Sequence, residues 1–199
     1  MLSMIAASLI VPPLVQSTVE RYTATTPMPI STNPLPAIEQ DELDDRVERF
    51  ADAIEEGLTP EPLLLSGQDL NALLQDLWED EEIPGEMALR IEDGRLRSNL
   101  SIPLKPGFSI GPFTPDVEGR YLNGTVTFRV ALKDGVLSTD IERFVMNGKT
   151  LPGWIVDAVE REFIDEQILD NKDLREFTDK LARVQVSADS ILLEAADRP

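Results

Sequence analysis

Among the side chains that commonly catalyse reactions or bind metals, this sequence is rich only in carboxylates. The chain of 199 residues has 37 Asp and Glu residues against 18 Lys and Arg, and it contains neither cysteine nor histidine. Disulfides, thiolate metal sites and cysteine nucleophiles are therefore excluded, and so is the usual general base near neutral pH. What remains is chemistry by carboxylates alone, such as glycoside hydrolysis or binding of Ca²⁺ or Mg²⁺.

The two densest acidic stretches fit neither chemistry. Residues 41–57, DELDDRVERFADAIEEG, lack the D-x-[DN]-x-[DN]-G spacing of an EF-hand, and the run at 79–82 offers carboxylates with no other ligand type. We interpret both as solvated helix surface. We therefore expect no catalytic residue, no metal site, no cofactor and no enzymatic activity. A carboxylate-only hydrolase ranks last among our hypotheses, since it needs two acids about 5–10 Å apart across a cleft.

A long connection at residues 103–119, PLKPGFSIGPFTPDVEG, is the best candidate for a binding site. Connections of this length without their own periodicity are often functional. This one carries Phe108, Ile110 and Phe113 in a segment expected at the surface. Two interpretations stay open: a flap that covers the sheet edge, or an apolar lip over a groove with Trp154 beneath it. Under the second interpretation these four residues are the candidate ligand-binding residues.

The net charge of −19 restricts the partners of the chain. Binding to nucleic acid requires clustered Lys and Arg, and the sequence has no basic stripe, so we expect no nucleic acid partner. Binding to anionic lipid head groups through charge alone is disfavoured for the same reason.

The N-terminal region favours a tether. Residues 1–16, MLSMIAASLIVPPLVQ, are apolar, but they are shorter than the roughly 20 residues of a spanning helix, and no basic residue precedes Arg21. We interpret them as a partial membrane anchor or signal, with a buried apolar arm as the alternative. Residues 17–40 are rich in Thr, Ser and Pro and are typical of an extended spacer. A single domain is then expected over residues 41–199.

Two amphipathic helices are predicted at the start of this domain. The first covers residues 41–57, with Gly57 as a natural C-cap. The second begins at Ser66, where Asp69 completes a capping box, and it ends at Pro84-Gly85. The apolar positions of the first helix are Leu43, Val47, Phe50, Ile54 and Leu58.

Antiparallel strands follow, because the apolar period changes to two. Asp93-Gly94 and Asp134-Gly135 predict hairpin turns, and Asn147-Gly148 is expected to end the fourth strand. The alternation slips between Ile141 and Phe144, which predicts a β-bulge. Two more helices and two short strands complete the chain. The order αα-ββββ-αα-ββ predicts an α+β fold with a curved antiparallel meander of five to six strands packed against the helices.

The phrase GRYLNG at residues 119–124 opens the third strand of this meander. We expect Arg120 at the end of the sheet, with its guanidinium reaching solvent. The apolar period runs on across Asn123-Gly124, which favours a bulge or a close backbone approach at Gly124 over a turn. We therefore interpret the phrase as the start of a strand and expect function in the loop before it.

Three phrases together, LSGQDLNALL, GRYLNG and MNGKTLP, resemble a group of bacterial membrane-anchored extracytoplasmic domains of unknown function. The layout is also similar to small tubular lipid-binding proteins, in which a curled antiparallel sheet wraps a long helix around an apolar groove. The resemblance covers roughly residues 45–195 and implies no catalytic residues. It implies a domain facing the periplasm or the cell exterior, anchored in the membrane by its N-terminal segment. The leading hypothesis is a groove that binds a lipid or an apolar partner segment, and the alternative is an assembly module of a cell-envelope complex.

Overall fold

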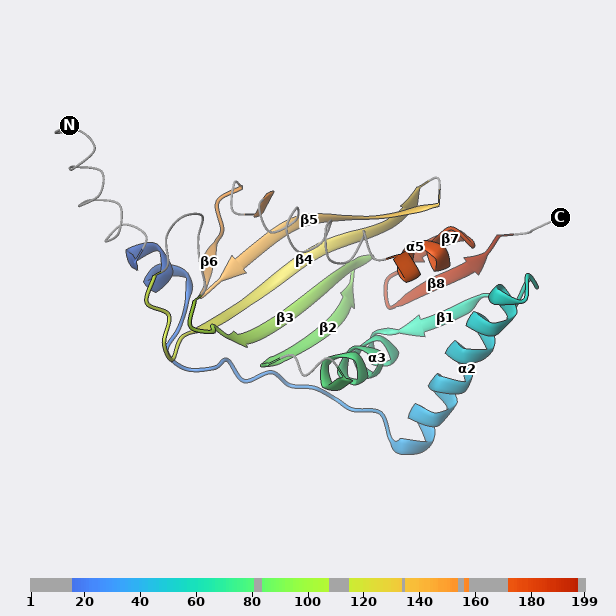
Figure 1. Cartoon of the computed structure of the whole chain (residues 1–199), viewed down its shortest axis with the longest axis horizontal. Coiled ribbons are helices and arrows are strands. Elements are labelled where there is room, and N and C mark those ends of the chain that lie inside the picture. The colour runs from blue at the N-terminus through green and yellow to red at the C-terminus, as the bar shows by residue number, and fades with distance from the viewer. Residues whose placement is uncertain are drawn as a thin grey trace.

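A computed structural model describes residues 16–80, 84–107, 115–133, 135–153, 156–157 and 172–196. Within these parts of the chain, eight strands form two antiparallel sheets, ordered β2-β3-β4-β5-β6 and β1-β8-β7 (Figure 1). The predicted α+β class with antiparallel strands and helices is confirmed. The strands are divided between two sheets, where one curved sheet was expected.

The larger sheet is a meander joined by tight turns. Its strands are β2 (Glu86–Glu92), β3 (Arg95–Pro103), β4 (Tyr121–Lys133), β5 (Val136–Met146) and β6 (Lys149–Thr150). Asp93 and Gly94 both have positive φ, 52° and 72°, as a two-residue hairpin turn that follows the twist of the strands requires. Asn147 and Gly148 have the same signs, 47° and 71°, so they do not simply end β5 but turn the chain into β6.

The register of this sheet separates an apolar face from a polar face. Leu96 of β3 lies opposite Phe128 of β4, and Ile102 lies opposite Leu122. The intervening pairs, such as Asn99 with Thr125, point to the other side because side chains alternate along a strand. The buried residues form two core clusters. The one called here the second core cluster lies on the apolar face and consists of Leu100, Phe144, Met146 and Leu151.

The predicted bulge in β5 is confirmed. Thr127 pairs with Arg143, whereas the next residue, Phe128, pairs with Ile141, so Glu142 is the extra residue. Its carboxylate accepts a bond of 2.5 Å from Arg95 Nε and forms an ion pair with Arg129. The extra residue restores the alternation of faces and turns a carboxylate toward Arg129 on the neighbouring strand β4 and Arg95 on β3, the strand beyond it.

Helix α2 (Ala37–Glu55) begins four residues before its predicted start, directly after Pro36. It ends with two backbone bonds typical of a Schellman motif, Gly57 N–H to Ile54 C=O at 3.2 Å and Leu58 N–H to Ala53 C=O at 2.8 Å. Gly57 has a φ of +74°, which reverses the chain. Leu58 therefore leaves the apolar face and is 58% exposed, contrary to the prediction.

The smaller sheet packs with α2 and α3 in the first core cluster. It contains β1 (Leu63–Ser66), β7 (Leu181–Val186) and β8 (Ser190–Ala195), and α5 (Lys172–Thr178) precedes β7. Phe177 of α5 packs edge-on against Phe50 of α2, with ring centroids 6.4 Å apart. Strand β7 also contacts β4, which joins the two sheets. The buried residues of this cluster are Leu43, Phe50, Ile54, Leu63, Leu65, Ala72 and Leu181.

Helix α3 (Gly67–Asp80) connects the small sheet to the edge of the large one. The predicted capping box is confirmed: Asp69 N–H donates to Ser66 Oγ at 3.1 Å, and Ser66 N–H donates to Asp69 Oδ2 at 2.8 Å. One turn later the side-chain amide of Asn71 pairs with the backbone of Leu89 in the edge strand β2. Its Oδ1 accepts from Leu89 N–H at 2.5 Å, and its Nδ2 donates to Leu89 C=O.

The expected spacer is ordered along the molecule. Residues 16–22 form a short helix at the end of the large sheet, and residues 23–36 run from there along the molecule to α2 (Figure 1). Residues 37–40, the last of the predicted spacer, belong to α2.

Candidate functional site

The residues predicted as an apolar lip lie outside the described residues. Phe108, Ile110 and Phe113 fall in the undescribed part of the connection at residues 103–119. Trp154, farther along the chain, is also outside the described residues. Their proposed role therefore stays a prediction. The candidate site that the structure does describe is the place where residues 16–28, here called the N-terminal segment, lie against the ends of β3, β4 and β5.

Arg120 lies at the end of the large sheet, as expected, directly before β4. Its guanidinium also binds the N-terminal segment, which was not expected. Its Nε donates to Thr23 Oγ1 at 2.5 Å, and its Nη2 is 3.3 Å from Thr23 C=O and 3.4 Å from Glu20 C=O. The planar guanidinium thus meets the last turn of the helix at residues 16–22 with several donors at once. The carbonyls at a helix end have no partner within the helix, so a cation placed there satisfies them.

Asn123, three residues later on β4, holds the extended part of the segment. Its Oδ1 accepts from Met28 N–H at 3.1 Å and from Ser101 Oγ at 2.9 Å, and its Nδ2 donates to Thr26 C=O at 2.8 Å. Ser101, on β3, is buried and also accepts from Met28 N–H at 3.1 Å. One side-chain amide therefore supplies both a donor and an acceptor to the backbone of the segment.

Asn147 reaches the segment from the turn between β5 and β6. Its Nδ2 lies 3.0 Å from Thr23 C=O and 3.4 Å from Arg21 C=O. Because the turn needs a positive φ at this position, asparagine serves both the turn and the contact. We call Arg120, Asn123 and Asn147 the clamp. All three come from the phrases GRYLNG and MNGKTLP.

Backbone and apolar contacts also hold the N-terminal segment, and all of its contacts together are here called its seat. Ala24 and Tyr121 exchange two backbone hydrogen bonds, of 2.9 and 2.8 Å. The side-chain amide of Gln16 pairs with the backbone of Asp116, with distances of 3.2 and 3.0 Å. Val19 is only 3% exposed, and Tyr22 packs against the second core cluster. The N-terminal segment is thus part of the fold.

Two glycines of the phrases make the approach possible. Gly119 has a φ of +66°, a conformation that side chains rarely adopt, and it turns the chain from the buried Val117 toward Arg120. For Gly124 the sequence favoured either a bulge or a close backbone approach, and the structure has the close approach. A Cβ atom there would lie 2.5 Å from Val145 C=O and would clash with Met146 Sδ.

The apolar face of the large sheet is the second notable surface. Several of its side chains are only partly buried, although they point away from the polar face. They lie on four neighbouring strands, and five of them, Met87, Ile102, Leu122, Val126 and Ile141, pack against the second core cluster. The members are Met87, Leu89, Ile91, Ile102, Leu122, Val126, Phe128, Val130, Leu137 and Ile141.

Comparison with protein-family models, with curated proteins and with solved structures finds no match. No helix among the described residues is long and apolar enough to cross a membrane. In the same part of the chain, no group of three or more acidic side chains is arranged to hold a metal ion.

Proposed function

We propose that the chain is a non-enzymatic domain tethered to a membrane and facing the periplasm or the cell exterior. On this proposal the apolar face of the large sheet accepts a lipid acyl chain, or an apolar segment of a partner protein. The observation that carries the proposal is the row of partly buried apolar side chains on that face. Large apolar surfaces that stay partly exposed are uncommon on proteins without a partner.

The seat of the N-terminal segment supports the tether. Residues 1–15 are apolar, and the chain that follows them is held at Gln16 by the backbone of Asp116 and up to Met28 by the clamp. A flexible spacer would leave the domain free to diffuse around its anchor. A clamped junction instead holds the domain at a fixed place beside the anchor, where a lipid has a short path to the apolar face.

Uptake of a fluorescent fatty acid by the full chain tests the proposal. Val130 lies on the apolar face, and Ala131, its neighbour on β4, points to the opposite side. We expect Val130→Gln to weaken uptake several-fold, because an uncompensated amide on an apolar contact surface opposes binding. Ala131→Gln is the matched control and should bind as the unmodified chain does.

Two results would count against lipid binding. One is gently purified protein with no lipid in its mass spectrum and no uptake of the fluorescent fatty acid. The other is equal uptake by the two glutamine variants, which would place the fatty acid elsewhere. Co-purification of a stoichiometric envelope protein together with the first result would favour the assembly module instead.

A further inference from the structure

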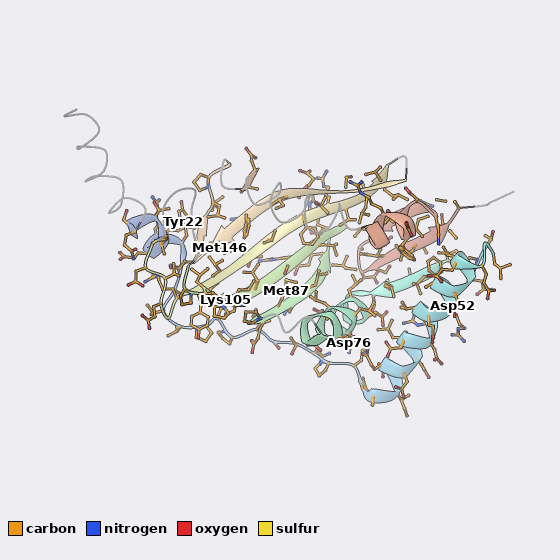
Figure 2. All side chains as sticks on the ribbon, viewed as in Figure 1. Tyr22, Asp52, Asp76, Met87, Lys105 and Met146 are labelled. Carbon is orange, nitrogen blue, oxygen red and sulfur yellow. The ribbon has the colours of Figure 1, made fainter. Side chains whose placement is uncertain are left out.

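The acidic residues are concentrated at one end of the molecule. Helix α2 carries eight carboxylates and two arginines, and α3 carries four carboxylates and no basic residue. Figure 2 shows Asp52 toward this end, far from Tyr22 and Lys105, and Asp76 between Met87 and Asp52. The negative charge of the chain is therefore unevenly distributed along its long axis, so the two ends differ in electrostatic potential.

The opposite end is balanced in charge. The exposed basic residues Arg21, Lys105 and Lys149 lie there, with Arg120 in the clamp. The acids Glu20, Asp116 and Glu118 accompany them. Lys149 pairs with Met146, which Figure 2 places at this end beside Tyr22. This is also the end at which residues 1–15 join the described chain.

Arg21 and Tyr22 have the character of residues at a membrane interface. The Arg21 guanidinium lies 5.6 Å from the centre of the Tyr22 ring, and the ring packs against the second core cluster. Tyrosine and arginine are both suited to the head-group region, because each combines apolar surface with a polar end. They lie six and seven positions after Val15, the last of the apolar residues 1–15.

We infer that the end formed by residues 16–22, 104–107, 116–119 and 147–150 is the surface that faces a phospholipid bilayer. The inference rests on the proposed tether and adds the orientation of the domain. Anionic head groups repel the carboxylates of α2 and α3, and this repulsion is weakest when those helices point away from the bilayer. The balanced end meets no such repulsion, and the clamp holds it beside the anchor.

The absence of cysteine allows a direct test. Single cysteines are introduced into the full chain as Lys149→Cys and Asp52→Cys, both at exposed positions, and are labelled with a fluorophore. The protein is bound to vesicles of phosphatidylcholine and phosphatidylglycerol that carry head-group nitroxides. We expect several-fold stronger quenching at position 149 than at position 52. Lys105→Cys, at the same end as Lys149, should behave as Lys149→Cys does.

The outcomes separate the orientation from the tether. Protein that floats with the vesicles but is quenched equally at both positions, or more strongly at position 52, overturns the orientation and leaves the tether standing. Protein that does not float with the vesicles overturns both. A circular dichroism spectrum equal to that of the unmodified chain verifies that each variant is folded.

Discussion

Side-chain amides in this protein repeatedly take the place of backbone peptide groups. Gln16 pairs with both backbone groups of Asp116, and Asn71 does the same with Leu89. Asn123 extends the pattern to two different residues of the N-terminal segment. A carboxamide presents one donor group and one acceptor, so it can complete a ladder where no further strand is available. The part-buried backbone groups of Leu89 and Met28 are thereby satisfied by side chains.

At this scale we predict that Arg120→Ala destabilises the folded chain by about 1–3 kcal/mol, because the part-buried hydroxyl and carbonyl of Thr23 lose a charged donor. Urea denaturation measures the change. Arg129→Ala is a control that also removes a paired arginine, but one that is 56% exposed, and it should cost under about 1 kcal/mol. Equal losses in the two variants would show that the clamp contributes no more than a surface ion pair.

At the scale of elements, α3 protects an edge of the large sheet. Strand β2 is the first strand in the order of that sheet, and an uncovered edge strand is a template for pairing with other chains. Asn71 occupies the backbone groups of Leu89 in the middle of this edge. The helix that the capping box starts at Ser66 is therefore also the element that closes the edge.

We predict that Asn71→Leu lowers the free energy of unfolding by about 1–3 kcal/mol, because the part-buried N–H and C=O of Leu89 lose their partners. Thermal unfolding measures the loss, and size-exclusion chromatography is expected to reveal self-association through β2. The control Gln40→Leu removes an exposed amide that donates to Asp76 between α2 and α3. A monomeric Asn71→Leu variant with unchanged stability would contradict the prediction.

The elements that could be predicted from the sequence depend on short-range patterns. The capping box of Ser66 and Asp69, the hairpin at Asp93-Gly94 and the bulge near Glu142 all show within a few residues of chain. Strand β1 could not be predicted in the same way. Its four residues precede a helix without a turn between them, and its partner β8 lies near the other end of the sequence.

The clamp was missed for a similar reason. Arg120 and Thr23 are 97 positions apart, and no local period links a strand start to a Thr-rich segment. The usable signal was in the phrases themselves, where Arg120, Asn123 and Asn147 fall beside glycines at strand ends. The lip formed by Phe108, Ile110 and Phe113 stays a prediction, because these residues lie outside the described ones.

At the scale of the whole molecule, the N-terminal segment connects regions that are distant in the sequence. Its first part packs on the second core cluster through Tyr22, and the chain then runs along the molecule to α2, which packs in the first cluster. The proposed tether and the proposed orientation both depend on this connection. A domain boundary drawn at residue 41 would remove it.

We therefore predict different effects for two truncations. Removal of residues 1–15 should leave the stability of the domain nearly unchanged. Removal of residues 1–28 should lower it by at least about 2–3 kcal/mol, because the burial of Val19 and Tyr22 is lost together with the bonds of the clamp. Urea denaturation of both proteins measures the difference. Equal midpoints for the two would show that the domain is independent of the segment.

The two asparagines of the clamp stand in a sequence context that favours deamidation. Asn123 and Asn147 each precede a glycine, and asparagine is a thermolabile residue. Its deamidation replaces the Nδ2 donor by a carboxylate oxygen. At Asn147 this oxygen would face the carbonyls of Arg21 and Thr23, so a hydrogen bond would become a repulsion. In aged protein the contacts of the N-terminal segment would then loosen, while the first core cluster stays intact.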